Sequence, residues 1–352
     1  MLVKIKDICQ VVSGATPATK IPSYYDGNVY WITPKDLADN GDRKYIDDCS
    51  RKITESGYNS CSTAMIPKNN ILISTRAPIG YIAINTMECC TNQGFKSLIC
   101  DTSKVNVDYL YYLLKSRMHE IELLGSGTTF KEVSKTSIEN FEIDLFFLDI
   151  QKKIASILSS IDAQIERNNA MAKRLQVLGK TVYSKKITNC LFDKMSLNAV
   201  ITTGKEDANH AKINGKYKFF TCGDNSLMCD DFKFEGKSVL VSGNGNFNVK
   251  YYDGKFNAYQ RTYIVKNDKI IGNLYYTLLF NTELFRKKSN GSIIKFITID
   301  MLKKIDVPIF PNEINNALNK ILSKINEIQS NTFKLNNFKE ILIPILINGQ
   351  LQ

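Results

Sequence analysis

The sequence repeats itself at a constant spacing, and this repeat limits the possible folds more than any other feature. Leu110-Tyr111-Tyr112-Leu113-Leu114 returns as Leu274-Tyr275-Tyr276-Thr277-Leu278, an offset of 164 residues (274 − 110). At the same offset, Gly127-Thr128-Thr129-Phe130-Lys131 is matched by Gly291-Ser292-Ile293-Ile294-Lys295. An offset kept over this distance without a gap predicts two copies of one structural module in tandem.

Upstream of these segments the two copies resemble each other less closely. Ile71-Leu72-Ile73-Ser74 resembles Val239-Leu240-Val241-Ser242, and Gln93 resembles Gln260, but the spacing slips, as it does when loops of different length intervene. Two copies that share a framework and differ in their loops are suited to recognising two different targets, because loops carry recognition. The alternative is a structural duplication without a difference in role.

Length and composition favour a globular protein of at least two domains. The chain has 352 residues, enough for two domains that each bury a core. A hydrophobic content of 43% with 23% charged residues is typical of such proteins, and no apolar run approaches the roughly 20 residues that cross a bilayer. The start lacks the apolar stretch and small-residue cleavage site of a signal peptide. We therefore expect a cytoplasmic protein with no membrane partner.

The charge points to a polyanionic partner, and the cysteines and histidines argue against a metal site. A net charge of +11 and a pI near 9.0 are shared by ribosomal, membrane-surface and DNA-binding proteins. The nine cysteines form no Cys-x-x-Cys pair, and adjacent Cys89 and Cys90 are poorly placed for a disulfide or a tetrahedral metal. With only His119 and His210, a histidine-rich metal site is excluded. We expect free thiols and no bound metal.

Two heptad patterns predict long helices that pair through a coiled-coil seam. Each helix has about 35 residues and spans roughly 50 Å at 1.5 Å per residue, so the pair would act as a spacer. Polar Asn168 and Thr332, again 164 apart, interrupt the seams at equivalent points and would set the register. The alternative is that each helix packs only on its own domain. Pro344 should end or bend the second helix. The predicted pairing residues are Ile154, Leu158, Ile161, Ile165, Asn168, Leu175, Leu318, Ile321, Ile325, Ile328, Thr332 and Leu335.

The segments before the helices predict mixed α/β domains with irregular loops. Strands are expected at 81–84, 95–99 and 262–265, and helices at 107–118 and 271–285. The loop 242–248 is rich in asparagine and glycine and follows a strand. Either its amides contact base edges, as Asn and Gln contact adenine, or it is only a tight turn that uses the freedom of glycine.

The opening of each module resembles a target-recognition domain in the specificity subunits of type I restriction-modification systems. The resemblance rests on Val11-Val12-Ser13-Gly14-Ala15-Thr16-Pro17 and on 24–37, with a looser version at 200–205 and 215–221. The Gly-Thr-Thr segment and the helix 150–158 extend it over essentially the whole chain.

Two departures from the family pattern concern the helix starts. The second module has Pro308 and Pro311 before its helix, whereas the first has Asp144 and Phe147. Gln151 of the first copy is also replaced, by Asn315 in the second.

The resemblance implies the fold class and the domain boundaries. The class is α/β (α+β), with two mixed α/β target-recognition domains in tandem, each followed by a long helix. The two helices would pair as an antiparallel coiled coil with pseudo-two-fold symmetry. The expected boundaries are 1–148 and 189–311 for the target-recognition domains, and 149–188 and 312–352 for the spacer helices.

The resemblance also implies the partners. Each domain would read one half of a bipartite site in double-stranded DNA, and the helices would fix the gap between the halves. Two adenine-N6 methyltransferase subunits would dock on this chain, with ATP-driven restriction subunits beyond them. No cofactor is expected on this chain, since S-adenosylmethionine, ATP and Mg would belong to the partner subunits.

Basic, amide and hydroxyl side chains in or beside the repeated segments are the predicted contacts to phosphates and base edges. They are Thr16, Lys20, Lys35, Arg76, Tyr81, Gln93, Lys96, Lys131, Lys205, Lys216, Asn244, Asn246, Asn248, Lys250, Gln260, Arg261 and Lys295.

The sequence offers little for catalysis by this chain. An adenine methyltransferase needs an Asn/Asp-Pro-Pro-aromatic motif, and the chain has no Pro-Pro pair. Asp231 followed by Glu235-Gly236-Lys237 is only faintly like a metal nuclease, and two histidines leave no plausible Ser/His/Asp or Cys/His set. We expect a non-catalytic subunit, and the alternative is a DNA-processing enzyme, such as a nuclease, with duplicated lobes.

Overall fold

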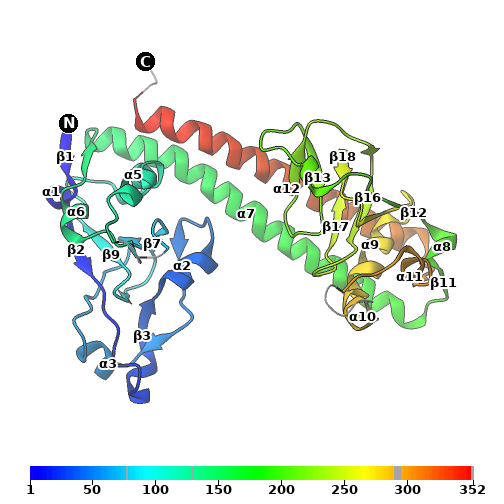
Figure 1. Ribbon diagram of the computed structural model, residues 1–352, viewed down its shortest axis with the longest axis horizontal. Helices are drawn as coiled ribbons and strands as arrows, with labels where there is room; N and C mark the ends of the chain where they lie inside the picture. Colours follow the sequence, from blue (N-terminus) through cyan, green and yellow to red (C-terminus); the bar gives the residue numbers. More distant parts are fainter. Residues whose placement is uncertain (77, 128–130, 289–294, 350–352) are drawn as a thin grey trace. The chain divides into compact units, whose positions relative to one another are not determined.

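The computed structural model describes residues 1–76, 78–127, 131–288 and 295–349 of a chain that divides into two compact units. Unit 1 comprises residues 1–164 and 335–352, and unit 2 comprises residues 165–334. Each unit therefore holds one globular part and a portion of each of two long helices (Figure 1). The repeated segments 128–130 and 291–294 lie outside the described residues.

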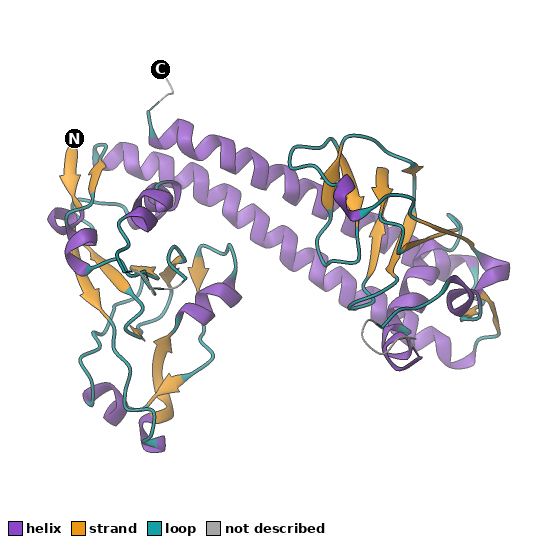
Figure 2. Ribbon diagram, in the orientation of Figure 1, coloured by secondary structure: helices purple, strands orange, loops and turns teal. Residues whose placement is uncertain are grey.

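The globular part of unit 1 is built from ten strands and several short helices (Figure 2). The strands are β1 (Leu2–Lys4), β2 (Cys9–Ser13), β3 (Tyr25–Ile32), β4 (Tyr45–Ile46), β5 (Lys52–Ile53), β6 (Ile71–Ile73), β7 (Ile82–Asn85), β8 (Cys90–Thr91), β9 (Lys96–Cys100) and β10 (Glu142–Asp144). The helices are α1 (Ile5–Ile8), η1 (Pro22–Tyr24), α2 (Pro34–Asn40), α3 (Glu55–Asn59), α4 (Val107–Ser116), α5 (Met118–Leu123) and α6 (Lys135–Glu139).

A five-stranded sheet with the order β2-β9-β6-β7-β4 forms the centre of unit 1. Its middle strand β6 is entirely buried and alternates between two cores, as side chains on a strand do. Ile71 and Ile73 join the core beneath α4 and the long helices, whereas Leu72 joins a second core on the other face. The remaining strands form the sheets β5-β3-β8 and β1-β10.

Unit 2 repeats this plan. Its strands are β11 (Phe192–Lys194), β12 (Val200–Thr203), β13 (Tyr217–Phe220), β14 (Leu227–Cys229), β15 (Phe234–Glu235), β16 (Ser238–Ser242), β17 (Val249–Tyr252), β18 (Lys255–Ala258), β19 (Thr262–Lys266) and β20 (Asp306–Pro308). Its shorter helices are η2 (Ile187–Asn189), α8 (Met195–Asn198), η3 (Ala208–His210), α9 (Ile271–Phe280), α10 (Thr282–Lys288) and α11 (Ile299–Lys303).

The sheets of unit 2 correspond to those of unit 1 strand by strand. The order β12-β19-β16-β17 matches β2-β9-β6-β7, and the antiparallel pair β11-β20 matches β1-β10. The parallel pairing of β13 with β18 likewise matches that of β3 with β8. The middle strand β16 again sends Val239 and Val241 to one core and Leu240 to the other. The predicted tandem of mixed α/β modules is confirmed.

The two long helices begin at equivalent residues. Helix α7 (Leu148–Lys186) has 39 residues and α12 (Asn312–Ile347) has 36, and their starts are 164 residues apart (312 − 148). The difference in prolines therefore does not shift the starts. The Gln151 amide donates to the Phe146 carbonyl at 2.8 Å, and the Asn315 amide donates to the equivalent Phe310 carbonyl at 2.9 Å. The shorter asparagine thus keeps this hydrogen bond at the helix start.

The expectation that Pro344 ends the second helix is wrong, because α12 continues to Ile347. A proline inside a helix removes one backbone hydrogen bond. Ile343, Leu346 and Ile347 around it are buried in the core of unit 1, and this burial offsets the loss.

Within each unit the two long helices run in opposite directions. In unit 1, Lys339 of α12 donates to Asp162 of α7 at 2.8 Å, and Gly349, just after α12, lies beside Phe146, just before α7. In unit 2, helix α9 contacts the end of α7 through Gly179 and the start of α12 through Leu318. The pairing is therefore antiparallel in both units. The helices also pack on the globular parts, so the two predicted alternatives for the seam hold together.

The polar break at Thr332 is satisfied within its own helix, because its hydroxyl donates to the Ile328 carbonyl at 2.8 Å. Among the helices that the structure describes, none is long and apolar enough to span a membrane.

Candidate nucleic-acid interface

One end of the central sheet in unit 1 is closed by a network of backbone hydrogen bonds between loops. Gly14, after β2, lies against the carbonyls of Thr91 and Asn92, and the close approach leaves no room for a side chain. The Thr75 amide, after β6, donates to the Gly94 carbonyl at 2.7 Å, and the Val133 amide donates to Thr75 at 2.9 Å. Four segments far apart in the sequence thus meet at this end of the sheet.

Unit 2 has the same network at the same end of its sheet. Gly204, after β12, lies against the carbonyls of Ala258 and Tyr259. The Gly243 amide, after β16, donates to the Arg261 carbonyl at 2.7 Å, and the Ile297 amide donates to Gly243 at 2.9 Å. The backbone framework is therefore conserved between the two copies although their loops differ in sequence.

The side chains carried by this framework differ between the units. Arg76 forms a backbone bridge with Glu132 in unit 1, and Asn244 forms the equivalent bridge with Phe296 in unit 2. At the turn before β9 or β19, Gln93 corresponds to Gln260, but Gly94 corresponds to Arg261. A guanidinium and an amide offer different donor and acceptor patterns to a base pair. The two sites can therefore recognise different sequences on one scaffold.

Unit 1 brings together most of its predicted contact residues at the end of the sheet. The Thr16 hydroxyl donates to the side-chain carbonyl of Gln93, and both lie beside the Gly94 turn. Pro34 and Arg76 also border Gly94, which places Lys35 next to the group. Tyr81 pairs with Ser74, two residues before Arg76, and Lys131 precedes Glu132. The exposed members are Lys35, Arg76, Tyr81, Gln93 and Lys131.

Two predicted residues of unit 1 are placed differently. Lys96 is buried, and its ammonium group forms an ion pair with Glu132 at 3.3 Å, so its charge is already compensated inside the protein. Lys20 is exposed in the loop before η1, and no contact joins it to the group at the sheet end.

Unit 2 gathers its predicted residues in two neighbouring places. Lys205, Asn244, Gln260, Arg261 and Lys295 border the hydrogen-bonded turns at the sheet end. Asn246, Asn248 and Lys250 line a pocket of about 350 Å³ together with Asp224 and Arg286. Lys216 is exposed but precedes β13, whose opposite end at Phe220 contacts the Tyr259 turn, so it does not join either group.

The asparagine-rich loop is a tight turn. Gly245 and Phe247 both have positive φ angles, of 72° and 52°, and the Ser242 amide donates to the Asn248 carbonyl at 2.9 Å. Phe247 is buried in the core of unit 2, which anchors the turn. The turn leaves Asn246 exposed and Asn244 half-buried, so both predicted interpretations are compatible.

Three residues that shape these sites were not predicted. Glu132 neutralises Lys96, and Asp224 accepts a hydrogen bond from the Asn248 amide. Burial draws down the pKa of Lys250, whose ammonium group donates to the Gly223 carbonyl. Sequence offset alone pointed to position 132, because Glu132 and Phe296 are 164 apart. Asp224 lies in a loop that has no counterpart at that offset.

Comparisons with known proteins place this architecture among restriction-modification proteins. The chain matches the family described as the type I restriction modification DNA specificity domain over residues 1–176 and 196–340. The type I restriction enzyme MjaIX specificity subunit of Methanocaldococcus jannaschii is 41% identical over 182 residues, covering 51% of this chain and 42% of that relative. The type I restriction enzyme EcoDI specificity subunit of Escherichia coli is 32% identical over 160 residues, covering 43% of this chain and 36% of that relative. Both alignments span less than half of the relative.

A solved structure shows the same fold. The S subunit of a type I restriction-modification system from M. genitalium superimposes with a TM-score of 0.67 at 15% identity, covering 99% of this chain and 96% of that chain.

Proposed function

Because the chain belongs to the family of type I restriction modification DNA specificity domains, we propose that it recognises double-stranded DNA as the specificity subunit of a type I restriction-modification complex. Each unit would read one half of a bipartite site. The chain itself would be non-catalytic and would bind no cofactor, since methylation and cleavage would take place on partner subunits.

The observation that carries this proposal is the pair of equivalent sheet ends with different side chains. The framework hydrogen bonds at Thr75 and Gly243 are the same, whereas Arg76 and Asn244 beside them differ. Arginine pairs best with guanine and asparagine with adenine, through two hydrogen bonds each in the major groove. A duplicated framework with exchanged base-reading side chains is what a reader of two different half-sites requires.

Exposed apolar side chains on the long helices support the docking of partner subunits. Apolar patches on a protein surface mark interaction sites when they are contiguous, and these helices leave several large side chains uncovered. We propose that two adenine-N6 methyltransferase subunits dock along them, with restriction subunits beyond. The exposed residues are Ile150, Ile157, Phe338 and Ile341 in unit 1, and Met171, Val177, Leu178 and Phe333 in unit 2.

Methylome sequencing of strains with and without the gene tests the proposal. We expect one bipartite motif with N6-methyladenine in each half to disappear when the gene is deleted and to return on complementation. If no such motif disappears, the proposal is wrong. Incubating the purified chain alone with DNA and Mg²⁺ separates the alternative, because cleavage without partners would identify a nuclease.

The spacer role of the helices has its own test. Removing one heptad from each helix, residues 165–171 of α7 and 329–335 of α12, keeps their 164-residue relation. It shortens each helix by about 10 Å, close to the rise of three base pairs. We expect the methylated motif to keep both half-sites and to lose about three base pairs from the gap. An altered half-site with an unchanged gap would contradict the spacer role.

A further inference from the structure

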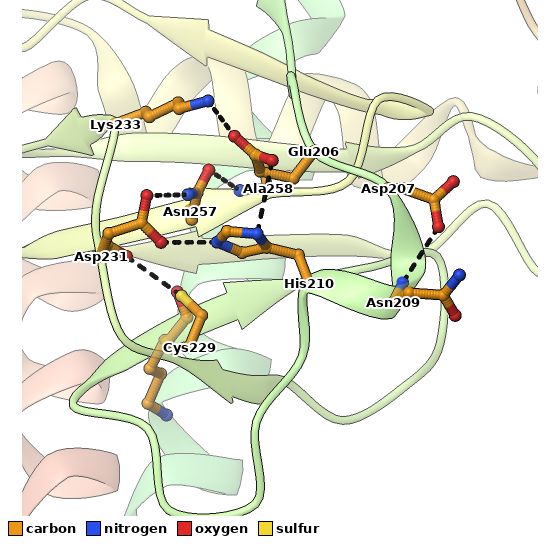
Figure 3. A network of polar contacts seen from close by, with 10 residues as sticks. Glu206, Asp207, Asn209, His210, Cys229, Asp231, Lys233, Asn257 and Ala258 are labelled. Atoms are coloured by element: carbon orange, nitrogen blue, oxygen red, sulfur yellow. Dashed lines mark hydrogen bonds and ion pairs between the residues drawn. The ribbon is translucent and has the colours of Figure 1, made fainter.

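Unit 2 contains a cluster of metal-ligating side chains away from the sheet end (Figure 3). His210 at the end of η3, Cys229 at the end of β14 and Asp231 just after it each offer one ligand atom, and these atoms all lie within 4.8 Å of one another. The Nε2 atom of His210 is 2.5 Å from Oδ1 of Asp231. Nitrogen, thiolate sulfur and carboxylate oxygen are the three donor types that Zn²⁺ takes in proteins.

A second layer of contacts holds the cluster in place. On the far side of the imidazole, Nδ1 of His210 lies 3.4 Å from Oε2 of Glu206, which is itself paired with Lys233 (Figure 3). A carboxylate beside the outer nitrogen fixes the tautomer in which Nε2 has a free lone pair, as it does for histidine ligands of zinc. The buried Asn257 amide lies 3.4 Å from Oδ2 of Asp231 and orients the carboxylate.

We propose that His210 Nε2, Cys229 Sγ and the Asp231 carboxylate bind one Zn²⁺ ion, with the fourth position open to water. The site would join the loop after Gly204 to the β14–β15 connection and so fix one side of the sheet β14-β13-β18-β15.

The geometry needs only a small adjustment to hold the ion. Tetrahedral Zn–N and Zn–O bonds near 2.0 Å place the two ligand atoms about 3.3 Å apart, so His210 and Asp231 must separate by about 0.8 Å. Asp231 is half exposed and can make this movement, and the exposed edge of His210 leaves a path for the ion. The Cys229 thiol is buried, and its proton would leave to solvent when the thiolate binds. Burial, followed by the charge of Asp231, raises the pKa of this thiol, whereas the His210 hydrogen bond lowers the pKa of Asp231.

A bound ion would also stiffen part of the candidate interface. The Gln260 amide donates to the Glu206 carbonyl at 2.9 Å, so the loop that carries His210 also supports the turn before β19. This consequence for DNA recognition rests on the proposed function. Zinc binding itself does not.

Metal titration of the untagged full-length chain tests the proposal. We expect one Zn²⁺ per chain after dialysis, and we expect Co²⁺ to give a thiolate-to-cobalt charge-transfer absorption in the near ultraviolet. The variants Cys229→Ser and His210→Gln should each lose the bound Zn²⁺, and Cys229→Ser should also abolish the charge-transfer band. Thermal unfolding should shift upward with added Zn²⁺ only in the wild type.

Cys222→Ser is the matched control, because Cys222 lies in the same unit but outside the cluster. It should bind the ion as the wild type does. His210 is partly exposed, so His210→Gln keeps the test meaningful if Cys229→Ser unfolds. Absence of bound Zn²⁺ in the wild type, or binding that both variants retain, would overturn the site whatever the chain does with DNA.

Discussion

The two units place different chemistry where the long helices meet the globular part. In unit 1 this region holds a buried network of charges. Asp162 of α7 accepts hydrogen bonds from Lys339 of α12 at 2.8 Å and from the Tyr112 hydroxyl at 2.5 Å. Lys44, also buried, donates to Tyr112 at 3.3 Å and pairs with Asp108 at 3.0 Å.

Unit 2 has lost these charges at the equivalent positions. At the 164-residue offset, Leu175 replaces Lys339 and Asn326 replaces Asp162. Tyr276 corresponds to Tyr112, and among the described residues its buried hydroxyl has no hydrogen-bond partner. Its ring packs directly on Gly179 instead.

The comparison separates what the scaffold needs from what each copy has added. Both units keep the tyrosine, the helix α4 or α9 and the antiparallel helices, so these are requirements of the fold. The ion network is an addition of unit 1, and it is costly to interrupt because each buried charge depends on its partner. The units should therefore respond unequally to equivalent substitutions.

The largest difference is expected at the Lys339 position. Lys339→Met leaves Asp162 buried without its ammonium partner and should destabilise unit 1 by about 3 kcal/mol. The equivalent Leu175→Met exchanges one apolar side chain for another and should cost less than about 1.5 kcal/mol. Urea unfolding with hydrogen exchange of α4 and α9 amides measures the two units separately. Equal losses would show that the network does not distinguish them.

Alkaline pH should affect both units alike, which sharpens the contrast with the ion network. Burial raises the pKa of Tyr109 in unit 1 and of Tyr183 in unit 2 to about 12 each. Because the folded-state pKa lies above the unfolded value near 10, this stability is complete below pH 10 and is lost as the pH rises through about 12. The loss should be about 2 kcal/mol for each tyrosine.

Tyr183→Phe is the control for this titration. It should remove the share of unit 2 while that of unit 1 remains. Urea midpoints between pH 8 and 12.5, chosen to bracket the titration, would contradict the assignment if this variant retained the whole loss in unit 2.

A smaller difference is expected for the equivalent tyrosines. Tyr112→Phe removes the hydrogen bond to Asp162 and should destabilise unit 1 by about 1.5 kcal/mol. Tyr276→Phe removes a buried hydroxyl without a partner and should be neutral or slightly stabilising. Thermal unfolding of the two variants compares them, and a loss at Tyr276 as large as that at Tyr112 would mean that its hydroxyl is bonded in solution.

The smallest effect concerns phosphate contacts. Lys131 and Lys295 occupy equivalent, exposed positions beside the two sheet ends. Replacing either with alanine should weaken DNA binding evenly across sequences and reduce the dependence of log affinity on log salt concentration by about 1. Binding titrations at several salt concentrations measure this slope. A sequence-dependent loss would assign the lysine to base reading instead.

The sequence predicted the duplicated scaffold well, because framework segments such as Leu110–Leu114 are buried in both copies and so retain their spacing. The helix starts and the equivalence of Gln93 and Gln260 followed from the same offset. Placement of single side chains could not be predicted. The burial of Lys96 depends on Glu132, which is 36 residues away, and the cluster of His210 and Cys229 depends on the pairing of β13 with β14. Such contacts arise from tertiary packing, which local patterns do not report.

The central claim is that the two sheet ends read separate halves of one site. Methylome sequencing of strains carrying Arg76→Ala or Asn244→Ala in place of the wild-type gene tests it most directly. We expect Arg76→Ala to relax base preference in one half-site and Asn244→Ala to relax it in the other, with a discrimination loss of about 1–3 kcal/mol at the affected base pair. Relaxation of both half-sites by either variant, or of the same half-site by both, would contradict the account.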